Sequence, residues 1–417
     1  MTRPEFTRTN AGPVNHHGSP TGDYRERIAL HSMAFAADPH SAYRSMRAKY
    51  GSLAPVELAP GVPATLVVGY RTAVRIMHDP AHFPADPRIW ERSVPSDCPV
   101  LPVLQWRPNA LRSTGSEHAR YRQANTDSIN GVDLHSMHTT VENIAVGLID
   151  DFGSVGTADL VAQYAFPLAF AAINAMLGCP PEIGQRIAEA TAIIFDSGDA
   201  ERGNRMLGDA VLELVQLKRD NPGNDITSRL LTHPTGLDDA ELVHQIVVLY
   251  GAGIEPLQNL IVNTVLLILT DERFAGSVLG GSLTTRDALD EVLFHDPPMA
   301  NFSVTYPRQP ILIDDVWLQA DQPVVISLAG CSNDLIGSAG DRTGNRSHLA
   351  WGAGPHACPA RSAAYLIAQD AIEQLLDALP DIRLAVPAAE LTWRPGPFHR
   401  ALAALPVVFP PMPTAGH

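Results

Sequence analysis

Cys358 stands between a glycine-rich turn and an amphipathic segment that runs to Leu379, within the stretch HLAWGAGPHACPAR at 348–361. Glycines at 352 and 354 let the backbone pass close to a flat ligand. At the start of a helix, free amide groups and the helix dipole favour a thiolate over a thiol. Backbone donors around a thiolate suit an iron centre bound through one sulfur, because they tune the electron density that the sulfur donates. A buried structural cysteine is the alternative, but this spacing favours the iron ligand.

The segment resembles the haem-binding loop of the cytochromes P450, whose pattern is F-G-x-G-x-H-x-C-x-G. The matching residues are Trp351 in the aromatic position, Gly352, Gly354, His356 and Cys358, with Ala360 in place of the last glycine. The resemblance implies that Cys358 is the metal ligand of haem b and that His356 lies near a haem propionate. It covers nearly the whole chain, and it implies the cytochrome P450 fold, which is mainly α with minor β.

Two further segments resemble haem-contacting motifs of that family. Glu117–Arg122 looks like the H-x-x-x-R of the C helix, in which His118 and Arg122 would meet propionates. One helical turn separates the two side chains, so both can point at one anionic group. A solvated helix face is the alternative for this pair. By the same resemblance, Arg308 fits the propionate-binding arginine that follows the K helix.

The segment Tyr250–Pro256 is similar to the I-helix motif A-G-x-[DE]-T, which crosses the oxygen-binding face. Small Ala252 and Gly253 leave room for dioxygen and water, and Glu255 would be the acid of the usual acid–alcohol pair. Pro256 takes the place of the alcohol; it removes a helical hydrogen bond but cannot relay a proton. Protons are therefore expected through ordered water, Glu255 or the substrate. A core helix kinked for packing explains Pro256 but not a carboxylate in an apolar run.

The K-helix motif E-x-x-R is incomplete, because Glu291 is present but Phe294 replaces the arginine. A buried carboxylate without a cation costs several kcal/mol. We therefore expect Glu291 to contact Arg342 or Arg346, which lie in the coil before the cysteine loop. Some bacterial members of the family look degenerate at this motif, so the haem assignment stands.

The resemblance also implies a substrate pocket lined by 86–112, 165–205, 250–255, 301–304 and 398–400. The candidate substrate contacts are Trp106, Arg112, Tyr250, Asn301, Phe302, Val304 and His399. With Arg107 and Arg400 they form a polar, cationic set that suits a carboxylate or peptide groups. This set and the altered I helix favour oxidative cross-linking of aromatic side chains in a peptide natural product of bacterial secondary metabolism. Hydroxylation of a small natural product and a catalytically weak haem-binding regulatory protein remain as alternatives.

Composition limits the partners and the compartment. The 417-residue chain has a formal net charge of −15 and no basic footprint, which argues against nucleic acid and anionic membranes. Four scattered cysteines, a polar N-terminal segment and the interrupted apolar run at 246–269 favour a cytoplasmic protein without a membrane span. No flavin or nicotinamide motif accompanies the chain. By resemblance, electrons would come from a ferredoxin and a ferredoxin reductase.

The expected organisation is a flexible tail at 1–22 followed by one cytochrome P450 domain at 23–417. Helices are expected at 42–50, at 71–79 and over most of 117–379, and strands at 54–58, 64–69, 311–313 and 323–327. The segment 80–115 holds seven prolines and is expected to be a long irregular loop.

Overall fold

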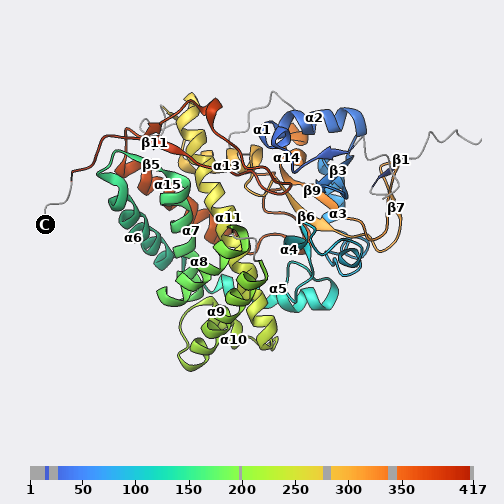
Figure 1. Cartoon of the computed structure of the whole chain (residues 1–417), viewed down its shortest axis with the longest axis horizontal. Coiled ribbons are helices and arrows are strands. Elements are labelled where there is room, and N and C mark those ends of the chain that lie inside the picture. Colours follow the sequence, from blue (N-terminus) through green and yellow to red (C-terminus); the bar gives the residue numbers. More distant parts are fainter. Residues whose placement is uncertain (1–14, 18–26, 197–199, 276–282, 337–344, 414–417) are drawn as a thin grey trace, which may run out of the picture.

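A computed structural model describes residues 15–17, 27–196, 200–275, 283–336 and 345–413. Helices form most of it, and strands gather on one side (Figure 1). Within the expected N-terminal tail, β1 (Asn15–His17) pairs with β8 in parallel. The rest of residues 1–22 lies outside the described residues, and so does Arg342.

The largest sheet has the strand order β2-β3-β4-β9-β6. β3 and β4 form an antiparallel pair, β9 joins β4 in parallel, and β6 closes the sheet antiparallel to β9. Two smaller sheets have the orders β1-β8-β7 and β10-β11-β5. The strands are β2 (Ile28–Ala29), β3 (Leu53–Ala59), β4 (Val62–Val67), β5 (Thr157–Asp159), β6 (Asn301–Thr305), β7 (Ile311–Ile313), β8 (Val316–Leu318), β9 (Val324–Ser327), β10 (Arg383–Leu384) and β11 (Pro406–Val408).

The helical part is built around α11 (Asp239–Thr270), which runs through the middle of the molecule (Figure 1). Asp238 and Glu241 cap its first turn reciprocally. The other α-helices are α1 (Met33–Ala37), α2 (Pro39–Tyr50), α3 (Tyr70–Met77), α4 (Leu101–Leu104), α5 (Gly115–Asn130), α6 (Leu134–Gly153), α7 (Phe166–Leu177), α8 (Pro181–Asp196), α9 (Ala200–Asp220), α10 (Ile226–Leu231), α12 (Glu272–Ala275), α13 (Thr285–His295), α14 (Leu328–Ile336) and α15 (Arg361–Ala378).

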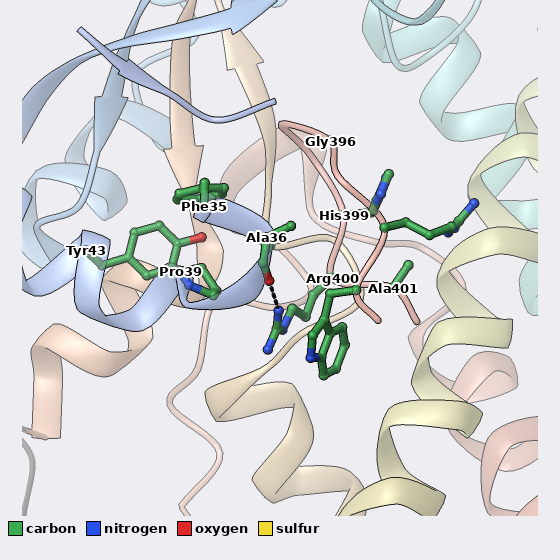
Figure 2. Close-up of a pocket in the computed structure, with 11 residues that line it drawn as sticks. Phe35, Ala36, Pro39, Tyr43, Gly396, His399, Arg400 and Ala401 are labelled. Atoms are coloured by element: carbon green, nitrogen blue, oxygen red, sulfur yellow. Dashed lines mark hydrogen bonds between the residues drawn. The ribbon is translucent and has the colours of Figure 1, made fainter. Parts of the chain in front are cut away.

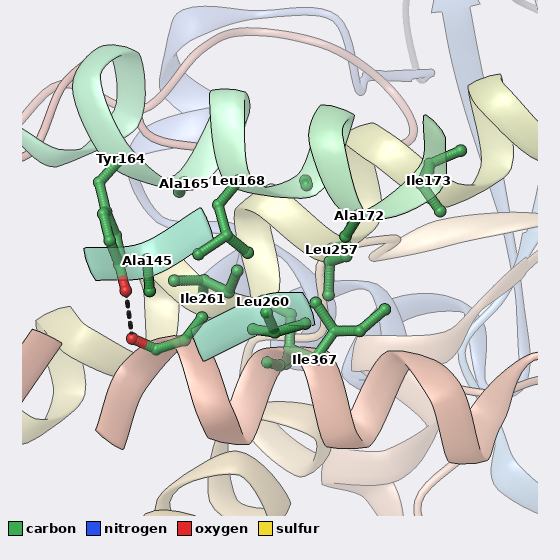
Figure 3. Close-up of a cluster of buried hydrophobic side chains, with 14 of the residues drawn as sticks. Ala145, Tyr164, Ala165, Leu168, Ala172, Ile173, Leu257, Leu260, Ile261 and Ile367 are labelled. Atoms are coloured by element: carbon green, nitrogen blue, oxygen red, sulfur yellow. Dashed lines mark hydrogen bonds between the residues drawn. The ribbon is translucent and has the colours of Figure 1, made fainter. Parts of the chain in front are cut away.

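The main hydrophobic core lies between α7, α11 and α15. Leu257, Leu260 and Ile261 of α11 pack between Leu168 on α7 and Ile367 on α15 (Figure 3). α11 is long and apolar enough to cross a membrane, but 56% of its most apolar window is buried within the protein. Its apolar character therefore has a sufficient explanation as the central core helix.

Helix and strand positions agree with the expectations from sequence. The fold class, mainly α with minor β, is confirmed, and the expected strand at 311–313 coincides with β7. The proline-rich stretch 80–115 contains only one turn of 3-10 helix, Trp90–Arg92, and α4 before α5 begins. This long loop therefore leads directly into α5.

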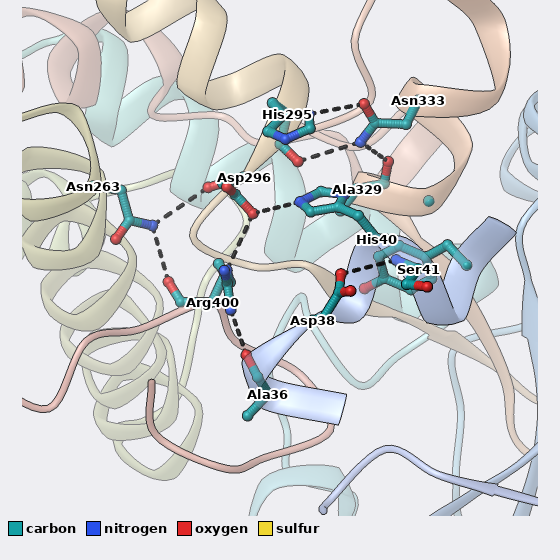
Figure 4. A network of polar contacts seen from close by, with 12 residues as sticks. Ala36, Asp38, His40, Ser41, Asn263, His295, Asp296, Ala329, Asn333 and Arg400 are labelled. Atoms are coloured by element: carbon teal, nitrogen blue, oxygen red, sulfur yellow. Dashed lines mark hydrogen bonds and ion pairs between the residues drawn. The ribbon is translucent and has the colours of Figure 1, made fainter. Parts of the chain in front are cut away.

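Asp296, at the end of α13, joins distant parts of the chain (Figure 4). Its Oδ1 lies 2.9 Å from His40 Nε2 on α2 and 3.1 Å from Arg400 Nε in the C-terminal segment. The neighbouring Asn263 of α11 donates to the carbonyl of Arg400 at 3.0 Å. Arg400 was expected to face substrate; the structure corrects this, because its guanidinium ties the C-terminal segment to the core.

Candidate active site

The loop before α15 is shaped by two glycines with left-handed backbone. Gly352 and Gly354 have φ values of +67° and +66°. A Cβ at Gly354 would lie only 2.1 Å from the carbonyl oxygen of Met77, at the end of α3. The amide of Cys358 donates to the carbonyl of Trp351 at 2.7 Å and closes the loop. The glycines thus seat the cysteine loop against α3 and present Cys358 just before α15.

The surroundings of Cys358 act in opposite directions on its thiol. Burial raises the pKa of Cys358, while a backbone N–H from Ala360 and the charges of Arg122 and Arg361 lower it. Cys331, by contrast, is completely buried and donates to the carbonyl of Val67, and burial raises its pKa strongly. The thiolate form of Cys358 is therefore stabilised by a backbone N–H and by guanidinium charge. An iron ligand requires this kind of stabilisation.

His118 and Arg122 of α5 meet the cysteine loop, as their spacing predicts. The His118 and His356 rings lie 4.0 Å apart between centroids, and Arg122 donates to the carbonyl of Ala357. Burial lowers the pKa of His118 to about 4 and that of His356 to about 3, and nearby arginine charge lowers both further. The two rings are therefore neutral near pH 7.

These residues fit a flat, anionic, iron-containing cofactor. Buried nitrogens of His118, Trp351 and His348 have no hydrogen-bond partner within the described residues. Near pH 7, the charges that act on His356 are those of Arg122 and Arg112, and no carboxylate of the described chain is among the causes of its pKa shift. A cation-rich, carboxylate-free surface beside a stabilised thiolate matches the two carboxylates and the iron of haem b. Cys358 would hold the iron, and His118, Arg122 and His356 would face the carboxylates.

In the middle of α11, the stretch 251–256 is accessible to solvent. Gly251 and Ala252 are exposed and Glu255 and Pro256 are half-buried, whereas the helix beyond is buried. Pro256 lies inside the helix and leaves the Ala252 carbonyl without its usual N–H donor. A Cβ at Gly253 would meet Ile173 at 2.8 Å, so this glycine allows close packing on α7.

Glu255 pairs with a residue that the sequence did not single out. Arg394 Nη2 lies 2.6 Å from Glu255 Oε1, and His399 Nδ1 lies 4.0 Å from the same oxygen. Arg394 and His399 come from the C-terminal hairpin, in which Trp393 pairs with Leu402; Figure 2 shows the turn of this hairpin beside α1 and α2. A basic residue close to the expected 398–400 turn was the available signal, but no local pattern connects 394 with 255.

Arg308 has a protein partner rather than a free guanidinium. Its Nη2 lies 2.7 Å from Asp86 Oδ2, and Arg88 binds the same carboxylate at 2.8 Å. Asp86 is 3% exposed, and both arginines lower its pKa against the effect of burial. Two guanidinium groups share this one carboxylate, so the propionate-binding role expected for Arg308 stays a prediction.

Of the two arginines expected to meet Glu291, Arg346 contacts the neighbouring carboxylate of Asp290, and Arg342 lies outside the described residues, so a contact of Glu291 with Arg342 stays a prediction. Arg346 Nε binds Asp290 Oδ2 at 2.7 Å, not Glu291, and Tyr365 donates to the same carboxylate. Glu291 Oε1 has Arg273 at 3.6 Å. Phe294 is 1% exposed and packs edge-on against His348. The carboxylate that anchors the coil at 345–346 is therefore one residue earlier than the sequence suggested.

The candidate substrate residues fall into two groups. Tyr250, Asn301 and Val304 are buried, and their polar atoms are used internally: Tyr250 donates to Asn174 at 2.7 Å, and Asn301 accepts from Tyr43 at 3.0 Å. The substrate contacts expected for these three residues stay a prediction. Trp106, Phe302 and His399 are half-buried, whereas Arg112 is buried with its guanidinium 5.4 Å from the centre of the Phe302 ring.

Relatives cover almost the full chain. No protein-family model matches it. It is 25% identical over 406 residues to cytochrome P450 107B1 of Saccharopolyspora erythraea, covering 93% of this chain and 98% of the relative. It is 28% identical to the cytochrome P450 monooxygenase PikC of Streptomyces venezuelae, covering 89% and 91%. A 2-hydroxy-5-methyl-1-naphthoate 7-hydroxylase of Streptomyces carzinostaticus is 26% identical, covering 89% and 95%.

Solved structures agree with these relatives. CYP154C4 of a Streptomyces species, with testosterone bound, superimposes with a TM-score of 0.83 at 26% identity, covering 92% of this chain and 98% of that one. P450BioI bound to an acylated acyl carrier protein gives a TM-score of 0.78 at 25% identity, covering 90% and 100%.

Fold, cysteine loop and relatives together define a haem-thiolate oxidoreductase. The chain belongs to the bacterial cytochromes P450, with altered K-helix and I-helix motifs. Its cofactor is haem b with a cysteine thiolate ligand, its oxidant is dioxygen, and its class is the monooxygenases of bacterial secondary metabolism.

Proposed function

We propose that this chain cross-links aromatic side chains of a peptide natural product, with Cys358 as the thiolate ligand of its haem. The observation that carries the proposal is the pair of residues 255 and 256 on α11, in the segment that resembles the oxygen-binding motif. Pro256 replaces an alcohol, and Glu255 Oε1 lies 2.6 Å from Arg394 Nη2. Without the alcohol, one ordinary proton donor is missing. A phenol substrate brings an O–H group of its own.

The coupling reaction balances without oxygen transfer to the product. When bound, haem supplies dioxygen activation: dioxygen, two electrons, two protons and one hydrogen from each of two rings give two waters and one new bond between the rings. The protein's part is to hold both rings in place and to keep water from competing.

Unpaired donors near Glu255 and in the loop before α5 support a substrate with a carboxylate or peptide groups. Arg394 Nε and His399 Nε2 are buried without hydrogen-bond partners in the described chain. Arg107, in the loop before α5, is half-buried and has no carboxylate partner among the described residues. A carboxylate or peptide carbonyl would satisfy such donors.

Hydroxylation of a small natural product is the second candidate. It is supported by the relatives, which include enzymes named as a naphthoate hydroxylase and as vitamin D(3) 25-hydroxylase. In this case, Glu255 and ordered water would have to supply both protons without an alcohol at position 256.

A product analysis separates the two candidates. Acetylated tripeptides that carry two tyrosines and a free carboxylate would be incubated with the haem-loaded protein, a Streptomyces ferredoxin, its reductase and NADPH. Loss of two hydrogen atoms by mass spectrometry supports coupling. Gain of one oxygen atom supports hydroxylation instead, and turnover of small aromatic acids but of no peptide would reject the peptide class.

We also propose a cytoplasmic enzyme that receives electrons from a ferredoxin and its reductase, as bacterial cytochromes P450 typically do. The cysteine loop packs against α3. Arg71 and Arg75 of this helix, His78 directly after it and Arg361 at the start of α15 are all exposed. This local positive charge stands out on a chain with a net charge of −15. It suits an acidic electron carrier that docks beside Cys358.

A further inference from the structure

Arg112 is a buried cation without an acid. Its residue is 3% exposed, and its Nε and Nη2 share one acceptor, the carbonyl of Val103, at 3.3 and 2.9 Å. No carboxylate pairs with it within the described ranges. Burial accordingly lowers the pKa of this guanidinium. A charge removed from water in this way costs several kcal/mol unless an anion compensates it.

The position of Arg112 points to where that anion belongs. The residue lies three positions before α5, the helix of His118 and Arg122, and its guanidinium lies 5.4 Å from the centre of the Phe302 ring. The guanidinium therefore lies close to the start of the helix that carries His118 and Arg122.

A second group in that region also lacks a partner. The hydroxyl of Tyr306 is buried without a hydrogen bond in the described chain, and Arg112 and Tyr306 interact electrostatically. A buried cation and a buried hydroxyl can be satisfied together by one carboxylate. The two carboxylates that act on Tyr306 are already used: Asp86 is shared by Arg88 and Arg308, and Glu91 accepts from the Trp106 amide.

We infer that Arg112 is a haem-anchoring residue that pairs with one haem propionate, with Tyr306 as a second donor. Arg122, which is half-buried, is then left for the other propionate, so two guanidinium groups neutralise two carboxylates. This role replaces the one expected for Arg308 and removes Arg112 from the substrate contacts. The inference rests on haem binding, and it is independent of the substrate proposed above.

The test measures haem loss from the ferric protein to excess apomyoglobin. Arg112→Met is compared with Arg308→Met, which removes a guanidinium of the same length from the Asp86 network, where Arg88 remains as a partner. We expect Arg112→Met to release haem about tenfold faster or more, because a charge-assisted hydrogen bond is lost. Arg308→Met should stay within about twofold of the wild type. Arg112→Lys should recover part of the loss.

A cofactor exchange shows whether the propionate is the partner. The wild type and Arg112→Met would be reconstituted with haem and with haem dimethyl ester, whose carboxylates carry no charge. Esterification should speed haem loss markedly in the wild type and much less in the variant, which is the coupling expected of a direct pair. Equal effects in both proteins would overturn the inference, as would rapid haem loss from Arg308→Met alone.

Two controls keep folding and cofactor failures apart. The reduced carbon monoxide spectrum shows whether Cys358 still ligates iron, and far-ultraviolet circular dichroism reports the fold. If Arg112→Met does not fold, haem and haem dimethyl ester are compared in Arg112→Lys instead. A weakened but measurable coupling between residue 112 and the carboxylate charge is then expected. Its absence would refute the pairing. A wild type that binds no haem would instead refute the cofactor assignment itself.

Discussion

At the scale of single residues, the chemistry of the site depends on the charged groups around Cys358 and Glu255. Cys358 receives a backbone N–H and two guanidinium charges, which favour the thiolate against the cost of burial. On the distal side, one carboxylate, Glu255, holds Arg394 in a pair whose members are both 42% exposed. Because solvent reaches this pair, it contributes little to stability and is open to exchange with a charged substrate group.

Arg394→Gln tests whether the distal arginine recognises anions. N-acetyl-tyrosine and its uncharged amide would be titrated against the ferric haem spectrum. We expect the variant to bind the carboxylate about tenfold more weakly and the amide unchanged, because only the carboxylate pairs with a guanidinium. Arg383→Gln, on the exposed strand β10, is the matched control. Equal weakening for both ligands would show that Arg394 acts only by positioning the hairpin.

His348 links the site to pH. Its ring is 9% exposed, and burial lowers its pKa to about 4, below the usual value of about 6.5 for an unfolded chain. Between these values the unfolded state binds more protons, so the free energy of unfolding falls as the pH falls through this window. His348→Asn keeps an acceptor for the Ala350 amide without titrating.

We therefore expect the wild type to lose about 2 kcal/mol more stability than His348→Asn when the pH drops from about 7.5 to about 5. Urea unfolding of both proteins at the two pH values, at matched haem content, measures the difference. Parallel pH dependences would mean that His348 is protonated in the folded protein.

At the scale of elements, the cysteine loop depends on its contact with α3. Gly354→Ala would place a methyl group against the Met77 carbonyl and strain a left-handed backbone, whereas Gly352→Ala adds the strain alone, with its nearest neighbouring atom 3.6 Å away. We expect Gly354→Ala to lose haem roughly tenfold faster than Gly352→Ala. Similar haem loss from the two variants would show that contact with α3 does not hold the loop.

Elements and local motifs were predictable, but their long-range partners were not. Periodicity located α2, β7 and β9, and the resemblance to the haem-contacting motifs implied that His118, Arg122, His356 and Cys358 lie together. Arg308, Arg346 and Arg394 show the limit. Arg308 and Arg346 were candidates and Arg394 was not, yet the partner of each was set by tertiary packing: Asp86, Asp290 and Glu255 are 222, 56 and 139 residues away in sequence. Nothing local in the sequence distinguishes such a carboxylate from its neighbours.

At the scale of the whole molecule, charge is distributed unevenly. The chain carries a net charge of −15, yet α3 presents Arg71 and Arg75 beside the cysteine loop. The C-terminal hairpin, which lies beside α1 and α2, places Arg394 against Glu255 of α11.

The double substitution Arg71→Glu, Arg75→Glu tests the docking side. We expect reduction by ferredoxin to slow about tenfold at low salt and to approach the wild-type rate at high salt, because opposed charges steer association. Stopped-flow formation of the reduced carbon monoxide complex measures the rate. Arg383→Glu provides the charge-matched control, and an equal slowing by it would contradict a specific docking face.

The central claim is that Cys358 ligates haem iron as a thiolate although Phe294 replaces the K-helix arginine. The most direct measurement is the absorption spectrum of the purified protein after reduction under carbon monoxide, for the wild type and Cys358→Ala. The account predicts a strongly red-shifted Soret band in the wild type and its loss in the variant. A wild type that binds haem without this shift, or a variant that keeps it, would contradict the claim.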